Sequence, residues 1–63
     1  MKHTEHAYIE AGHRYESATT LAAARARAEL IRHMLQAEHP TDHAEARRLI
    51  DQGRAEARRA AKL

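Results

Sequence analysis

The chain has 63 residues, a formal net charge of +2 at pH 7 with neutral histidines, and no cysteine. It therefore has room for one small domain and cannot form a disulfide. Charged residues of both signs make up 32% of the sequence, which argues against a strongly polycationic nucleic-acid-binding arm. No apolar run reaches the roughly 20 residues that span a bilayer. The N-terminal stretch also lacks the apolar core of a signal peptide, so we expect a cytoplasmic protein with no membrane association.

The apolar residues of the chain are small, which limits the core that it can build. Tryptophan and phenylalanine are absent, and alanine is the commonest residue type. One core in a chain below ~70–80 residues rarely supplies more than ~3–5 kcal/mol, and small natural domains add disulfides, metal ions or oligomerisation. Because disulfides are impossible, we expect self-association to supply the remaining stability.

The N-terminal segment, residues 1–16, has helical periodicity. It forms either a short separate helix or an extension of the helix that follows. Its apolar stripe runs on to residue 22 with alternating spacings of three and four residues, and consists of Tyr8, Ala11, Tyr15, Ala18 and Ala22.

Residues 21–35, with the sequence LAAARARAELIRHML, carry a second apolar stripe in another phase. Residues 17–20, SATT, and Gly12 lie between the stripes and include the weakest helix formers of the region. We expect one helix that is continuous or slightly kinked there and ends near His39. The alternative is a break near residues 12–17. The second stripe has heptad spacing and consists of Leu21, Ala24, Ala28, Ile31 and Leu35.

The single proline, Pro40, predicts a turn, because the residue before a proline is disfavoured in the α region. Asp42, with Glu45 three residues later, has the spacing of a capping box. We therefore predict a second helix from about Asp42 to Ala61. Small residues dominate its heptad seam, which requires a neighbouring helix to approach closely. The seam consists of Ala46, Ile50, Gly53, Ala57 and Ala60.

The predicted fold is all-α: a helical hairpin with a long first helix, a turn at Pro40 and a second helix. We expect the stripe of residues 21–35 to pack on the small-residue seam. The apolar arc of the first helix is wider than one neighbour needs, which favours a homodimer packed as a four-helix bundle. A lone, marginal hairpin or a segment that folds only on a partner is the alternative. The predicted dimer contact consists of Leu30, Ile31, Met34 and Leu35.

Catalysis is not expected from this sequence, and neither is a cofactor. The chain has no cysteine nucleophile, and its only serine, Ser17, lies outside any Gly-x-Ser-x-Gly elbow. Gly12 and Gly53 are isolated, so no glycine-rich phosphate-binding loop is present.

Four polar residues share one face of the predicted N-terminal helix: His3, His6, Glu10 and His13. Two histidines one turn apart can bind Zn²⁺ or Ni²⁺, with a carboxylate as third ligand. A solvated polar face is the favoured interpretation. We therefore predict no metal site, and keep His6, Glu10 and His13 as weak candidates.

Two functional hypotheses remain. The first is a non-enzymatic protein that binds and modulates another protein through a helical surface. Its predicted contacts are Tyr8, Ile9 and Tyr15, because tyrosine is enriched at protein interfaces and this stripe is out of phase with the expected intramolecular seam.

The second hypothesis is a small dimeric nucleic-acid-binding regulator. Four cations follow one side of the second helix beside the alanine seam, and rows of arginine can bind phosphates. Nearby carboxylates weaken this field. The predicted contacts are Arg47, Arg54, Arg58 and Lys62.

Overall fold

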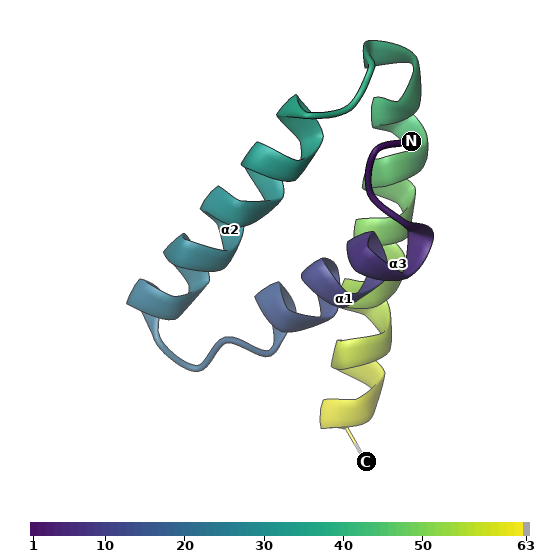
Figure 1. Cartoon of the computed structure of the whole chain (residues 1–63). Coiled ribbons are helices and arrows are strands. Elements are labelled where there is room, and N and C mark those ends of the chain that lie inside the picture. The colour runs from purple at the N-terminus through teal and green to yellow at the C-terminus, as the bar shows by residue number, and fades with distance from the viewer. Residues whose placement is uncertain (63) are drawn as a thin grey trace.

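The protein is described by a computed structural model over residues 1–62. All of the regular secondary structure in that range is helical, as predicted. Figure 1 shows α2 and α3 diverging from the turn between them, with α1 lying across α3. The elements are α1 (Glu5–Glu16), α2 (Leu21–Gln36), the short 3-10 helix η1 (Pro40–Asp42) and α3 (His43–Ala61).

The link between α1 and α2 corrects our expectation of one continuous first helix. α1 ends where the Ser17 hydroxyl donates a hydrogen bond of 2.8 Å to the carbonyl oxygen of His13. α2 begins after Thr20, whose hydroxyl accepts a hydrogen bond of 3.1 Å from the Ala23 N–H. Hydroxyl side chains that bond to the nearby backbone compete with helix continuation. Residues 1–16 therefore contain a separate short helix, the alternative that we favoured less.

α1 and α3 cross at two glycines. A Cβ added to Gly12 would overlap the carbonyl oxygen of Ile50, and a Cβ added to Gly53 would overlap the carbonyl oxygen of Ile9. Only glycine permits two backbones to approach this closely. The predicted close approach of a helix to the small-residue seam is thus confirmed. The helix that we expected to pack on this seam is wrong, because the seam packs on α1 and not on residues 21–35.

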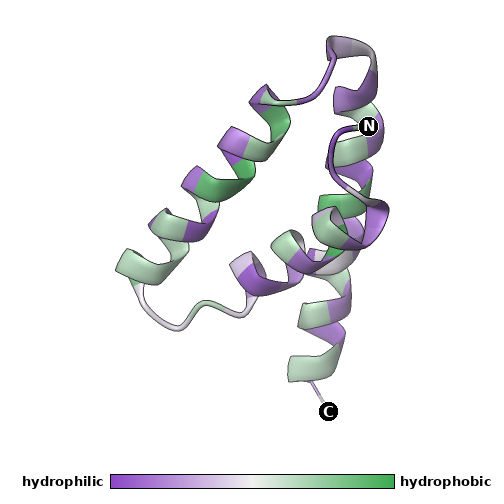
Figure 2. Ribbon diagram, viewed as in Figure 1, coloured by the Kyte–Doolittle hydropathy of each residue, from purple (hydrophilic) through white to green (hydrophobic). Residues whose placement is uncertain are grey.

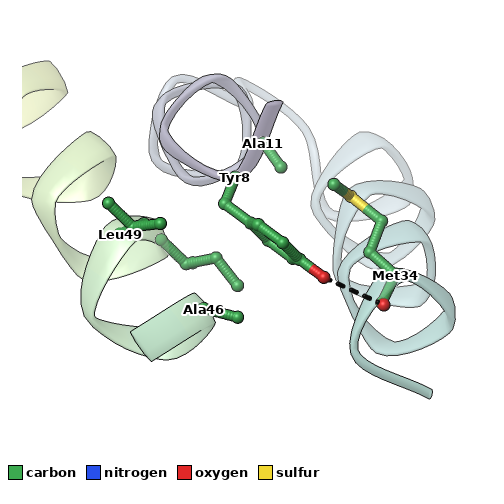
Figure 3. Packing of buried hydrophobic residues seen from close by; sticks show 6 residues of the cluster. Tyr8, Ala11, Met34, Ala46 and Leu49 are labelled. Atoms are coloured by element: carbon green, nitrogen blue, oxygen red, sulfur yellow. Dashed lines mark hydrogen bonds between the residues drawn. The ribbon is translucent and has the colours of Figure 1, made fainter. Parts of the chain in front are cut away.

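The core is built around Tyr8, which is fully buried. Figure 3 shows its ring pointing away from α1 between α3 and the end of α2. The Tyr8 hydroxyl donates a hydrogen bond of 3.1 Å to the carbonyl oxygen of Met34. Burial is the main reason that the pKa of Tyr8 lies far above its ordinary value, and the nearby Glu38 carboxylate raises this pKa further. The other buried members of this core are Ala11, Met34, Ala46, Leu49 and Ile50.

The turn between α2 and α3 contains Pro40, as predicted, but its capping differs from our prediction. The Asp42 side chain makes no capping hydrogen bond, because η1 leads into α3 without an extended residue. A side-chain cap is found instead at the start of η1, where His39 Nδ1 accepts a hydrogen bond of 3.2 Å from the Thr41 N–H.

The N-terminal arm, residues 1–4, is held by Glu38, which is only 5% exposed. Its carboxylate accepts hydrogen bonds of 2.8 Å from the backbone N–H groups of Lys2 and His3. The His3 ring then packs edge-on against Tyr8, with 5.6 Å between the ring centroids. Burial alone raises the pKa of Glu38, but these N–H donors, together with Tyr8, hold it below its usual range.

Candidate functional site

The heptad stripe of α2 is the candidate binding surface, and we name it the α2 stripe: Leu21, Ala24, Ala28, Ile31 and Leu35. Leu21 is 68% exposed, and Ala28 is also exposed. Ile31 and Leu35 are half-buried, because they pack against the core near the Pro40 turn. Met34 is the one buried residue within α2. The stripe is therefore covered at its C-terminal end and open at its N-terminal end.

The α2 stripe stays open because α1 occupies the seam of α3 that would otherwise receive it. α2 and α3 diverge from their turn, as Figure 1 shows, and pack little on each other within residues 1–62. Figure 2 shows hydrophobic residues along α2 and on α3 where α1 crosses it. A cleft of about 200 Å³ lies along the stripe, and it is lined by Tyr15, Ala28, Ile31, Ile50 and Arg54.

One wall of this cleft carries a charge cluster that joins α1 to α3. The guanidinium of Arg54 lies 5.0 Å from the centroid of the Tyr15 ring, a distance typical of a cation–π contact. Arg54 Nε and Arg58 Nη1 each donate a hydrogen bond of 2.9 Å to Glu16 Oε1. The Arg54 hydrogen bond is the main reason that the pKa of Glu16 lies below its usual range, against the opposing effect of burial.

Cations also border the stripe on α2 itself. Arg25 and Arg32 are exposed, and each lies three or four residues from members of the stripe, which places them along its outer edge. Arg32 pairs with Glu29, whose pKa lies below its usual range mainly because of that hydrogen bond. The outer edge of the stripe is therefore richer in cations than in carboxylates.

A second surface groove lies between α1 and α2 on the other flank of α2. Leu30 is 55% exposed there and borders a groove of about 390 Å³. An ion pair with no net charge lies at one rim of the groove, where Arg14 Nη2 is 2.5 Å from Glu10 Oε1. The groove is lined by Ala11, Arg14, Ala23, Ala26, Arg27 and Leu30.

The predicted partner contacts Tyr8, Ile9 and Tyr15 do not form an exposed surface. Tyr8 is the centre of the core, Ile9 is half-buried at the α1–α3 crossing, and Tyr15 is half-buried under Arg54. Because the chain breaks after α1, α1 can pack on α3 with the side of the helix that carries Tyr8, Ile9 and Tyr15. Only Tyr15 borders the cleft beside the α2 stripe.

The predicted dimer contacts are divided between the core and the surface. Met34 is 8% exposed and belongs to the core of one chain. Ile31 and Leu35 are half-buried, and Leu30 is exposed. Of these residues, Leu30 therefore offers the largest accessible apolar side chain.

The predicted nucleic-acid row is partly neutralised within the chain. Arg54 and Arg58 share the carboxylate of Glu16, so the two cations are paired within the chain. Arg47 and Lys62 are exposed.

The weak metal candidates are not assembled into a ligand set. His6 Nε2 lies 3.5 Å from Glu10 Oε2, while His13 Nδ1 lies 3.4 Å from the Ser17 hydroxyl. His3 precedes α1 and packs on Tyr8. Among residues 1–62, no group of three or more histidine, aspartate or glutamate side chains is placed to hold a metal ion.

Two features escaped the sequence interpretation. Glu38 gives no sequence signal of burial, because its partners are backbone N–H groups 35 and 36 residues away. The open end of the α2 stripe depends on the break at residues 17–20, which the sequence marks only by weak helix formers and a change of stripe phase.

Helices capable of crossing a bilayer are not found within residues 1–62, since none combines sufficient length with a sufficiently apolar composition. Comparison of the chain with known protein families, curated proteins and solved structures finds no match.

Proposed function

We propose that this chain is a non-enzymatic interaction protein that binds and modulates another protein through the α2 stripe. The observation that carries the proposal is the solvent exposure of the N-terminal part of a heptad stripe. Leu21 and Ala28 are exposed although their spacing is that of a helix–helix seam. A contiguous apolar surface rimmed by polar residues is typical of interaction sites. A cytoplasmic location, expected from the sequence, belongs to the same proposal.

α1 and α3 form a fixed support for this surface. We therefore expect the stripe to bind a partner and not to fold into the core of its own chain. α1 and α3 are locked by the reciprocal glycine contacts, so the seam of α3 is already filled. Ile31 and Leu35 anchor one end of the stripe in the core. A partner helix can therefore extend an existing helix layer, as in helix-in-groove recognition.

Site-specific photocrosslinking in the native host tests this proposal. A crosslinking amino acid at Ala28 should capture a defined protein, whereas the same group at Ala22, an exposed residue of α2 outside the stripe, should not. The captured protein, once purified, should bind the wild-type chain and lose affinity for Ala28→Glu at least about tenfold, with Ala22→Glu as control. Equal binding of both variants, or no capture specific to position 28, contradicts the proposal.

The predicted homodimer stays a proposal of its own, with its contact moved to the α1–α2 groove. Leu30 is an exposed knob beside a floor of Ala11, Ala23 and Ala26, so the same patch offers both a projection and a hollow, as an isologous two-fold contact requires. α1 and α2 of two copies would then form a four-helix bundle. Sedimentation equilibrium should show a dimer that Leu30→Asp dissociates, and a folded wild-type monomer at micromolar concentration contradicts it.

Nucleic-acid binding is an alternative with less support. Arg54 and Arg58 both donate to Glu16, and this carboxylate offsets part of the positive charge of the row. An electrophoretic shift at low salt that Arg47→Ala weakens is the result that favours this alternative.

A further inference from the structure

We infer that the partner of the α2 stripe is an amphipathic helix whose own apolar seam is flanked by acidic residues. This inference rests on the proposed function and specifies the chemistry of the partner. The apolar part follows from the stripe itself, whose heptad spacing fits a facing helix. Small residues at Ala24 and Ala28 permit that helix to approach closely, with Leu21 as a projecting contact at the open end.

The acidic part follows from the charges on both sides of the cleft. On α2, the exposed Arg25 and Arg32 follow the outer edge of the stripe. On α3, Arg54 lines the opposite wall, and the exposed Arg47 lies two helical turns before it on the same side. The acids near these walls are fewer, and consist of Glu16, Glu29 and Asp51.

A second copy of the chain fits this surface less well. Two α2 stripes packed face to face in antiparallel orientation would bring the Arg25 and Arg32 edge of one copy against the same edge of the other. Like charges placed together across an interface oppose association. An acidic helix meets the same edges with attraction, and its carboxylates can be shared by Arg54 in addition to Glu16, since one guanidinium carries several donors.

Two designed peptides of about three heptads serve as probes. Both carry leucine and alanine at the seam positions; one has glutamate at the flanking positions and the other has lysine. Fluorescence anisotropy of each labelled peptide with the full chain measures affinity at low and high salt. We expect the glutamate peptide to bind at least about tenfold more tightly than the lysine peptide, and this preference to shrink at high salt.

A charge-reversal variant makes the test specific. Arg25→Glu combined with Arg32→Glu changes two exposed side chains outside the core, so helix content by circular dichroism should stay unchanged. This variant should invert the preference and bind the lysine peptide better. Arg59→Glu, at an exposed position of α3, is the control for a general change of charge and should keep the preference for glutamate.

Each other outcome overturns the inference. Equal affinity for both peptides means that charge plays no part, and the crosslinking result at Ala28 then decides the proposed function separately. Binding of neither peptide rejects an acidic helix as the occupant. Dimerisation of the chain that Ala28→Glu abolishes identifies a second copy instead. A duplex DNA or RNA probe that binds wild type and is lost with the charge-reversal variant identifies a nucleic acid.

Discussion

Gly12 and Gly53 face each other's helix in a reciprocal arrangement. Gly12 lies against the carbonyl of Ile50, three residues before Gly53, and Gly53 lies against the carbonyl of Ile9, three residues before Gly12. The same three-residue step on both helices makes the crossing nearly symmetric. This contact decides which helix occupies the seam of α3, and so it also decides that α2 is left open.

Alanine at either glycine should destabilise the protein. Helix propensity alone favours Gly→Ala by ~1 kcal/mol, but the new Cβ meets a carbonyl that cannot move without separating the helices. Overpacking of this kind costs about 1–3 kcal/mol or more. We expect Gly12→Ala and Gly53→Ala each to lower the free energy of unfolding in urea by about 2 kcal/mol. Gln52→Ala, at the exposed neighbouring position, should be close to neutral. Stabilisation by Gly53→Ala contradicts the crossing.

The buried Tyr8 should be the largest single contributor among the side chains of the core. Tyr8→Ala removes a fully buried ring, and comparable aromatic-to-alanine changes cost about 3–5 kcal/mol. Tyr8→Phe removes only the hydrogen bond to the Met34 carbonyl and should cost about 1 kcal/mol. Equilibrium unfolding of both variants measures these losses. Tyr15→Ala, at a half-buried position, should cost less than Tyr8→Ala, and the reverse order rejects this core.

The break between α1 and α2 should depend on the cap at Thr20. Because its hydroxyl accepts from the Ala23 N–H, Thr20→Ala should lower the free energy of unfolding by about 1 kcal/mol. Thr19→Ala changes the preceding exposed residue and provides the matched control. Thermal unfolding followed by circular dichroism compares the two. An equal effect of both variants means that Thr20 does not cap α2.

Acidification should weaken the protein partly through Glu38. Burial alone raises the pKa of Glu38, but the Lys2 and His3 N–H groups hold it below the ordinary value of 4.5. A lowered folded-state pKa gives stability that is present above the unfolded-state value and is lost as the pH falls through the folded-state value. Glu38→Gln should therefore be less stable than wild type at neutral pH and lose less stability on acidification.

Urea unfolding of wild type and Glu38→Gln, at neutral pH and at about pH 4, measures this difference. Glu56→Gln, an exposed substitution on α3, is the control and should follow wild type. Parallel pH profiles for wild type and Glu38→Gln would show that the carboxylate does not hold the N-terminal arm.

The all-α class, the turn at Pro40 and the second helix were predictable, because periodicity and proline geometry are local properties of the sequence. The pairing of the helices was not. Both Tyr8–Ala22 and Leu21–Leu35 have heptad spacing, so periodicity alone cannot choose which stripe meets the seam at Gly53. The Ser17 hydroxyl, which donates to the His13 carbonyl, ends the first helix, and the Thr20 hydroxyl, which accepts from the Ala23 N–H, starts the next. This break decides which stripe meets the seam.

The surface chosen from the sequence differs from the surface that the structure leaves exposed for the same reason. With α1 turned onto α3, Tyr8 enters the core and the α2 stripe takes its place at the surface. Tyr15 alone remains beside the candidate site, because it borders the cleft. Glu38 was not predictable, since its carboxylate bonds to backbone groups that no side-chain pattern marks.

The central claim is that α1 fills the seam of α3 and leaves the N-terminal part of the α2 stripe uncovered. Nuclear Overhauser contacts in the isotope-labelled chain test it most directly. The account predicts contacts from the Tyr8 ring to Ala46 and Leu49, and from Gly53 Hα to Ile9, with none between the Ala28 and Ala57 methyl groups. Strong contacts between Ala28 and Ala57, together with a solvent-exposed Tyr8 ring, would mean that α2 packs on α3 as a simple hairpin and would contradict the account.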